Sequence, residues 1–478
     1  MAAMKIFASR LWHSPTFTTW GSLGVRLSVV VLVLPLVLVR FAPAEVVVWQ
    51  LFSTLFTLVL MLDFGLSPTF SRMLAFARGG ASLADMADMR RSGIVRIPNL
   101  HTASVVFAAL RWFYPRLALG IIALFAVIGT LALQRPIAQI VAPDAAWAAW
   151  VLVLTSSAVG FWGNAYASAL QGMNSIAPLR RWEVATGLAQ IGTSIAVLVS
   201  GGGLFALVAA YQFWVIFNAL RNRLLLKRLH PALFNRPATP DPEVLRVMWP
   251  ATWRSGVGVL MSQGIIQASG VIYSQFGIPA EVAAYLLALR IMTMISQFAQ
   301  APFYSKLPYL AELQASGDRE TQMLFAQKGM RLAHWIFVAG VIGVAVFIQP
   351  ALDLIGSRTH FVPAGVWALM SLAFFMERYG AMHLQLYSLT NHIVWHIANG
   401  VTGVLMIGIA VLAYPSLHAY AFPLAMLLAT GGFYCTYAVR HSSAAMGLHI
   451  ATFESRTSLM PAVVLCTMLS ARLLFLSN

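Results

Sequence analysis

Apolar stretches of about twenty residues recur along the whole chain, and they constrain its fold more than any other feature. A helix needs about 20 residues to cross a hydrocarbon core of about 30 Å. Of the 478 residues, 59% are hydrophobic and only 10% are charged, whereas about 25% are charged in an ordinary soluble domain. Soluble folds of this length could not bury so much apolar surface. The composition therefore predicts a membrane protein and excludes a soluble enzyme, a disordered chain and a disulfide scaffold.

The apolar stretches predict an all-α polytopic membrane protein with twelve core spans. Helices are expected because a spanning helix satisfies all of its backbone hydrogen bonds internally. Short links between spans make many successive helices antiparallel neighbours. A further apolar stretch, 458–476, follows a polar segment and is a candidate for a thirteenth span. The core spans are predicted at 20–40, 46–63, 116–134, 147–170, 183–200, 204–220, 250–272, 282–303, 332–349, 364–387, 393–413 and 419–439.

The positive charge of the chain predicts its orientation. The net charge is +16, from 31 Lys and Arg against 15 Asp and Glu. With a cytoplasmic N-terminus, 22 of these cations fall in inner segments, and only Arg40, Arg135 and Arg358 fall in outer ones. This asymmetry matches the positive-inside rule. The cations are spread over every inner loop rather than gathered in one patch, which argues against a nucleic-acid partner.

Two short motifs recur at nearly the same offset and predict an internal duplication. Pro43–Val46 and Pro279–Val282 both read Pro-Ala-Glu-Val and lie 236 residues apart, while Pro68–Arg72 resembles Pro302–Lys306 at an offset of 234. An even number of spans separates the copies. The prediction is two six-helix bundles related by a parallel repeat, an arrangement found in some transporters. The alternative is that Pro-Ala-Glu-Val is only a good helix start.

This duplication predicts three segments of the chain. Residues 1–240 would form the N-terminal bundle with its cytoplasmic linker, and 241–440 the C-terminal bundle. Residues 441–478 would form a tail that contains the additional helix.

Three arginines within predicted spans are the candidate substrate-binding residues: Arg26, Arg290 and Arg378. A charge at mid-bilayer costs at least about 2.5 kcal/mol, so such residues usually face a protein interior or an aqueous cavity. For Arg26, which is near a span end, snorkelling toward the interface is an equal alternative. Arginine keeps its charge and binds phosphate oxygens in a bidentate manner. The three residues together suggest an anionic, phosphorylated substrate.

Two acidic residues are candidates for proton coupling or charge balance. Glu377 precedes Arg378, but adjacent helical residues point about 100° apart, so their sequence proximity does not establish a pair. Glu377 is expected either to pair with an arginine of another helix or to carry a proton. Asp63 ends the second predicted span just before Gly65, where a hinge or a helix cap is the alternative role.

Amides within the spans are candidate contacts for sugar hydroxyls, and we select Asn164, Gln263 and Gln267. Gln263 and Gln267 are four residues apart and share one face of an α-helix. Hydrogen bonding between helices is the alternative role for each. Cys435, Cys466, His334 and His383 are expected to be packing residues.

No catalytic, cofactor or metal-binding motif occurs in the sequence. A P-loop, an H-E-x-x-H motif, a G-x-S-x-G motif and an Asp-rich metal motif are all absent. The cysteines lack metal-binding spacing. The sequence therefore predicts neither an enzyme nor a requirement for a cofactor or metal.

Short motifs in both halves of the chain point to a known family. They are Phe41–Trp49, Leu62–Leu66 and Pro68–Arg72 in the first half, and Ala288–Arg290, Lys306–Pro308 and Leu313–Asp318 in the second. These motifs resemble those of the polysaccharide and O-antigen flippases of the multidrug/oligosaccharidyl-lipid/polysaccharide exporter superfamily. The resemblance extends to about residue 440.

The resemblance implies a flippase in the bacterial inner membrane that works by alternating access between two bundles around a cationic cavity. The implied cargo is an undecaprenyl-pyrophosphate type of lipid-linked oligosaccharide, whose pyrophosphate would meet Arg26, Arg290 and Arg378. Membrane lipid, a polysaccharide polymerase and a chain-length regulator are the other implied partners. A cation-coupled drug antiporter of the same fold is the main alternative, although the first span has Arg26 and no acidic residue. A membrane glycosyltransferase or polymerase is the third alternative.

Overall fold

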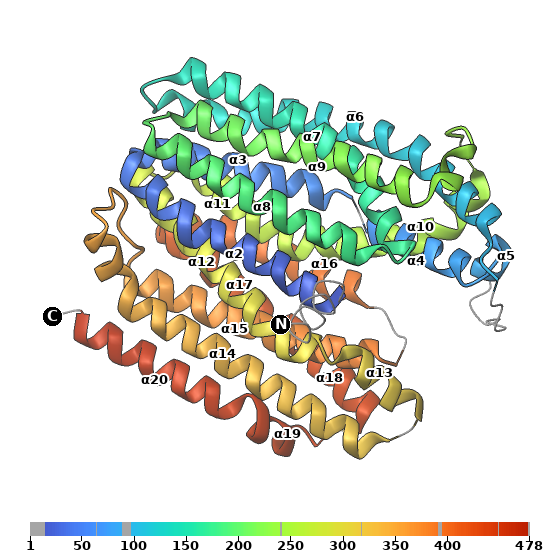
Figure 1. Ribbon diagram of the computed structural model, residues 1–478. Coiled ribbons are helices and arrows are strands. Elements are labelled where there is room, and N and C mark those ends of the chain that lie inside the picture. Colours follow the sequence, from blue (N-terminus) through green and yellow to red (C-terminus); the bar gives the residue numbers. More distant parts are fainter. Residues whose placement is uncertain are drawn as a thin grey trace, which may run out of the picture. The chain divides into compact units, whose positions relative to one another are not determined.

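The chain folds into long helices, as the apolar pattern predicts (Figure 1). The secondary structure of the described residues is helical and contains no strand, which confirms the all-α class. Nine of the described helical stretches are long and apolar enough to cross a membrane, or ten if a bent C-terminal pair is one span. The protein is therefore a multi-pass membrane protein, and the count of twelve spans stays a prediction. The computed structural model describes residues 15–63, 65–87, 97–239, 241–316, 318–390, 394–447 and 449–476.

The chain divides into two compact units, Met1–Gly256 and Val257–Asn478. The boundaries that the sequence predicts at 240 and 440 stay predictions. The helices of the first unit are α2 (Pro15–Arg40), α3 (Pro43–Met61), α4 (Leu66–Arg78), α5 (Leu83–Ala87), α6 (Leu100–Ala138), α7 (Pro143–Gly172), α8 (Ile176–Val199), α9 (Leu204–Leu229), the 3-10 helix η1 (Pro231–Asn235) and most of α10 (Pro242–Val259).

The second unit contains helices that are interrupted by short turns of π- and 3-10 helix. Its C-terminal helices α19 and α20 meet at a bend of 56°. The elements are η2 (Leu260–Gly264), α11 (Ile265–Tyr273), α12 (Pro279–Tyr304), α13 (Leu307–Ser316), α14 (Arg319–Leu354), α15 (Ala364–Ser388), α16 (Trp395–Leu417), η3 (His418–Tyr420), α17 (Ala421–Ala429), η4 (Thr430–Tyr434), α18 (Cys435–Met446), α19 (Ile450–Thr457) and α20 (Leu459–Leu476).

Both copies of the Pro-Ala-Glu-Val motif start a helix. Pro43 and Pro279 are each the first residue of their helix, α3 and α12, and each is followed by a glutamate in the first turn. Proline suits this position because its missing N–H would have no partner there. The glutamates complement the positive end of the helix dipole. The motif thus explains two helix starts, and the repeat itself stays a prediction.

The second recurring motif occupies different local structures in its two copies. Pro68 lies in α4, which begins after a break at Gly65, where φ is 74°. A residue with a side chain is disfavoured in this left-handed conformation, so glycine suits the break. Pro302 instead lies inside α12, near its end. The first unit therefore breaks its helix before the motif, and the second unit breaks it within the motif, at Ser305 and Lys306.

Small residues allow close helix packing within each unit. In the first unit, a Cβ atom at Gly163 of α7 would lie only 2.6 Å from the Cβ of Ala219 on α9. In the second unit, a Cβ at Gly380 of α15 would lie 2.5 Å from the Tyr434 ring. Close backbone approach through small residues is typical of helices in membranes. At Gly380 it brings α15 against η4, next to the polar residues described below.

Candidate functional site

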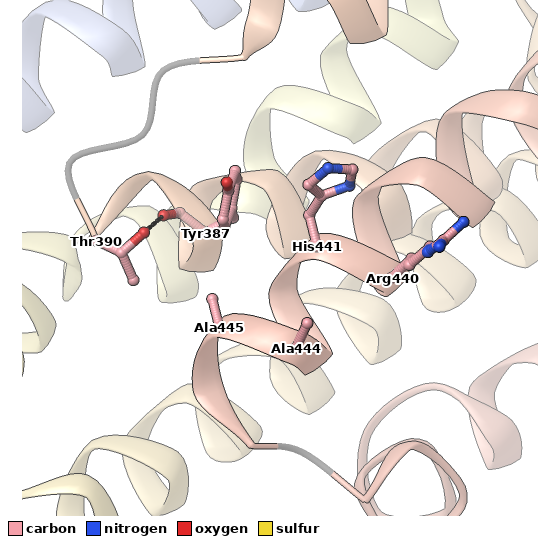
Figure 2. A pocket seen from close by; sticks show the side chains of 6 residues that line it. All are labelled: Tyr387, Thr390, Arg440, His441, Ala444 and Ala445. Carbon is pink, nitrogen blue, oxygen red and sulfur yellow. Dashed lines mark hydrogen bonds between the residues drawn. The ribbon is translucent and has the colours of Figure 1, made fainter.

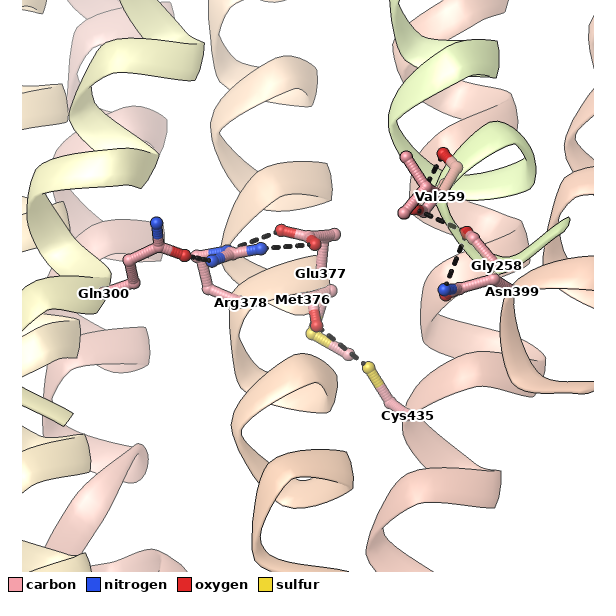
Figure 3. Close-up of polar contacts among 9 residues, drawn as sticks. Gly258, Val259, Gln300, Met376, Glu377, Arg378, Asn399 and Cys435 are labelled. Carbon is pink, nitrogen blue, oxygen red and sulfur yellow. Dashed lines mark hydrogen bonds and ion pairs between the residues drawn. The ribbon is translucent and has the colours of Figure 1, made fainter. Parts of the chain in front are cut away.

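A buried ion pair lies in the middle of α15 in the second unit. Arg378 donates from Nε to Glu377 Oε2 and from Nη2 to Glu377 Oε1, both at 2.6 Å (Figure 3). The two side chains are only 10% and 12% exposed. Although adjacent residues leave a helix in different directions, both side chains are long enough to turn toward each other. In this structure Glu377 therefore pairs with Arg378, its neighbour in the sequence, and not with a described arginine of another helix.

Gln300 of α12 makes a further polar contact with Arg378. Arg378 Nη1 donates a hydrogen bond to Gln300 Oε1 (Figure 3). The guanidinium has five N–H groups, of which these contacts use three. Arg378 is thus held by a carboxylate on its own helix and by an amide on a neighbouring helix.

A cavity of about 30 Å³ adjoins Glu377, a volume that suits about one water molecule. Two single turns of π-helix, η2 and η4, both contribute to its wall. π-Turns inside α-helices are frequent at functional sites. The side chains around the cavity are Met261, Ser262, Ile266, Glu377, Asn399, Thr402, Gly403, Met406, Met426, Thr430 and Tyr434.

Side chains satisfy the backbone next to the first π-turn. The carbonyl of Gly258 accepts hydrogen bonds from Asn399 Nδ2 at 3.0 Å and from Ser262 Oγ at 2.9 Å. On the other side, Cys435 Sγ lies 3.1 Å from the carbonyl of Met376 (Figure 3). Irregular backbone at membrane depth requires such partners. The region around Glu377 is therefore irregular in its backbone yet well hydrogen-bonded.

The remaining predicted residues of the second unit are Arg290, Gln263 and Gln267. Arg290 is partly buried in α12. Gln263 belongs to η2 and Gln267 to α11, so the π-turn alters the four-residue spacing that would place them on one α-helical face. Both are partly buried. Met261, Ser262 and Ile266 of the same helical run line the 30 Å³ cavity, whereas Gln263 and Gln267 do not.

The first unit holds Arg26, Asn164 and Asp63. Arg26 belongs to α2, but its side chain is outside the described part of the structure. Asn164 is partly buried on α7, beside the close approach at Gly163. The roles assigned to these residues stay predictions.

Asp63 lies at the junction between α3 and α4. Its Oδ1 accepts from Tyr114 Oη at 2.6 Å, and its Oδ2 accepts from the Ser67 N–H at 2.7 Å. Ser67 is in the first turn of α4, where backbone N–H groups lack partners within the helix. The carboxylate thus acts as a helix cap and links α4 to α6.

A second polar pair joins different helices of the second unit. His383 Nε2 on α15 lies 3.0 Å from Glu454 Oε1 on α19, and His383 Nδ1 lies 2.8 Å from Ser442 Oγ on α18. Glu454 also accepts hydrogen bonds from Thr457 and Ser458. His383 is 2% exposed. The contacts fasten the short helix α19 to the bundle.

Sequence reasoning missed Gln300, Asn399 and Glu454. The first two are amides within apolar stretches, so their polarity was a detectable signal. Glu454 lies in a polar segment, where nothing in the sequence distinguishes a buried carboxylate from an exposed one.

The long apolar helices define a helical, multi-pass membrane protein. No family model matches the chain, and no curated protein matches its sequence. The fold is nevertheless shared with solved structures over nearly the whole chain.

These structures include multidrug exporters and a lipid flippase. An inward-facing multidrug resistance MATE family transporter of the MOP superfamily matches with a TM-score of 0.61 at 15% identity, over 91% of this chain and 100% of its own. Lipid II flippase MurJ in an inward closed conformation matches with a TM-score of 0.60 at 11% identity, over 91% and 90%. An outward-facing MATE family transporter gives a TM-score of 0.55 at 13% identity, over 93% and 98%. At these identities the likeness establishes the fold.

Proposed function

We propose that the protein is a flippase for a polyprenyl-pyrophosphate-linked oligosaccharide. It would move this lipid from the cytoplasmic to the periplasmic leaflet by alternating access, for the assembly of O-antigen or exopolysaccharide. The observation that carries the proposal is the buried guanidinium of Arg378, which is held in bidentate geometry by Glu377. The fold that the chain shares with lipid II flippase MurJ supports a lipid cargo.

The geometry of Arg378 suits exchange of one anion for another. Carboxylate and phosphate both bind the guanidinium fork in bidentate geometry. A pyrophosphate can therefore take the place of Glu377, while Gln300 keeps its contact with Nη1. Glu377 then either takes up a proton or remains ionised beside the 30 Å³ cavity. In this mechanism Glu377 balances the charge of Arg378 before the cargo arrives.

The other predicted residues have supporting roles in this proposal. Arg290 and Arg26 add positive charge for the pyrophosphate, and Asn164, Gln263 and Gln267 hydrogen-bond with the sugars. The N-terminus is cytoplasmic, and the membrane is the bacterial inner membrane. A polymerase and a chain-length regulator would receive the exported lipid.

The main test measures surface polysaccharide in cells that depend on this chain for export. Arg378→Ala and Arg290→Ala should each reduce export at least about tenfold, because each loses a charge-assisted contact with the pyrophosphate. Arg378→Lys keeps the charge without the fork and should lie between wild type and Arg378→Ala. Arg331→Ala is the matched control, because Arg331 is an exposed arginine of the same unit. Immunoblots of membranes must show equal amounts of each variant. Full export by both Arg378→Ala and Arg290→Ala would refute the proposed site.

A multidrug antiporter is the second candidate, because two of the solved structures above are MATE transporters. The same cells distinguish the two functions. Changed drug susceptibility with unchanged polysaccharide would favour the antiporter. Formation of polymer by the purified protein would instead indicate an enzyme.

A further inference from the structure

A hollow of about 520 Å³ lies beside α18 in the second unit (Figure 2). Tyr387 on its wall is nine residues after Arg378 on α15, or about 13 Å along the helix. The volume falls within the range of about 300–1,000 Å³ that is usual for small-molecule sites. The lining side chains are Tyr387, Thr390, Arg440, His441, Ala444 and Ala445.

Two alanines leave this space open. Ala444 follows Arg440 by four residues and Ala445 follows His441 by four, so each alanine lies one turn beyond a basic residue on the same face of α18. A larger side chain at either position would extend into the hollow. The sequence thus places two basic groups at the edge of a space that is bounded by methyl groups.

His441 is oriented by its neighbours. Its Nδ1 lies 2.8 Å from the carbonyl of Tyr437, and a carbonyl can only accept, so Nδ1 carries the hydrogen. Its Nε2 is then the nitrogen that is left for a ligand. The ring centroid lies 4.1 Å from that of Tyr437 and 5.3 Å from that of Tyr387.

The hollow is positively charged. Arg440 is exposed and forms no ion pair with a described residue, and none of the six lining residues is acidic. In contrast, Glu377 neutralises Arg378. An anionic group at Arg440 therefore has no carboxylate to displace.

We propose that this hollow binds the diphosphate of a lipid-linked sugar, with Arg440 as the charged donor and His441 Nε2 as a second polar contact. The choice of a lipid-linked cargo rests on the proposed function. The space beside Tyr387 and Thr390 accommodates the attached sugar. In the predicted topology α18 ends at the cytoplasmic side, where the cargo would enter. The hollow is thus a first docking site, separate from Arg378.

Binding measurements on the full chain in lipid nanodiscs test the site. The probes are farnesyl pyrophosphate, inorganic pyrophosphate and farnesol. Arg440→Gln should weaken binding of farnesyl pyrophosphate at least about tenfold, because it removes a charge-assisted hydrogen bond. His441→Phe keeps the aromatic packing and should weaken binding about fivefold. Ala444→Leu keeps both basic groups, fills the hollow and should also weaken binding. Arg331→Gln is the charge-matched control and should bind as the wild type does.

Three results would overturn the proposal or its lipid-linked cargo. Unchanged binding by both Arg440→Gln and Ala444→Leu would overturn the proposal, as would equal binding of farnesol and farnesyl pyrophosphate. Inorganic pyrophosphate that binds as tightly as farnesyl pyrophosphate would overturn the lipid-linked cargo and assign the hollow to free diphosphate. The proposed function fails separately, if Arg378→Ala and Arg290→Ala both export polysaccharide fully.

Discussion

Helix α15 carries two polar side-chain pairs that are built in different ways. Arg378 pairs with Glu377, its neighbour on the same helix. His383, further along α15, pairs with Glu454 on α19. Replacing the partner of Arg378 does not require any helix to move, whereas losing Glu454 removes a contact between two helices. The first arrangement suits exchange with a ligand, and the second suits structural attachment.

The surroundings of the two pairs also suit ligand exchange at Arg378 and structural attachment at His383. Glu377 adjoins a cavity and two π-turns. His383 is enclosed by Ser442 on one side and Glu454 on the other, and its ring packs against Tyr379 and Phe453. We therefore expect substitutions at the first pair to change both transport and stability, and substitutions at the second pair to change stability with little effect on transport.

The largest effect is expected for Glu377→Ala. This substitution leaves Arg378 buried without its counter-charge, and breaking a buried ion pair in this way costs about 3–5 kcal/mol. The purified variant should unfold at a clearly lower temperature in detergent than the wild type. Glu377→Gln keeps an acceptor for the guanidinium and should lose less. Equal stability of Glu377→Ala and wild type would show that Arg378 finds another partner.

The double substitution Glu377→Leu/Arg378→Met separates stability from transport. Replacing both members of a buried pair by apolar residues is often neutral or stabilising. The double variant should therefore recover most of the stability that Glu377→Ala loses. Because it lacks the guanidinium, it should still fail to export polysaccharide. Export by a stable double variant would assign the Arg378–Glu377 pair a structural role, like that of the His383–Glu454 pair.

The positions of the helices could be predicted from the sequence, whereas the pairing of charges could not. Apolar stretches and proline-acid helix starts act locally, so they placed α3 and α12 correctly. The partner of Glu377 depends on how two long side chains bend, and with about 100° between neighbouring residues the sequence did not establish the pair that forms.

The π-turns could not be predicted from the sequence either. Leu260–Gly264 resembles an ordinary helical segment. In Thr430–Tyr434, Gly431 and Gly432 disfavour an α-helix, but they do not specify a π-turn. The turns depend on partners such as Asn399 on another helix. Likewise, Glu454 becomes a buried residue only because α19 folds back onto α15. Tertiary contacts, rather than local sequence, determine these parts of the site.

A smaller effect is expected at the second pair for Glu454→Ala. The substitution removes the carboxylate beside His383 and the acceptor of Thr457 and Ser458. Leaving such buried polar groups without partners costs about 1–3 kcal/mol. Thermal unfolding should shift downward, while export per folded molecule should remain near that of the wild type. A stable variant with strongly reduced export would place Glu454 in the transport mechanism instead.

The smallest effect is expected for Ser442→Ala, which removes one hydrogen bond to His383 Nδ1 and leaves Glu454 in place. A single neutral hydrogen bond contributes about 1 kcal/mol. Combining Ser442→Ala with Glu454→Ala tests whether the contacts of His383 act as one unit, since residues in one network are not additive. Once Glu454 is absent and α19 is released, the hydrogen bond to Ser442 should stabilise the fold less. The double variant should then lose less stability than the sum of the two single losses. Strict additivity would mean that α18 and α19 hold His383 independently, and that the second pair is two separate contacts rather than one attachment.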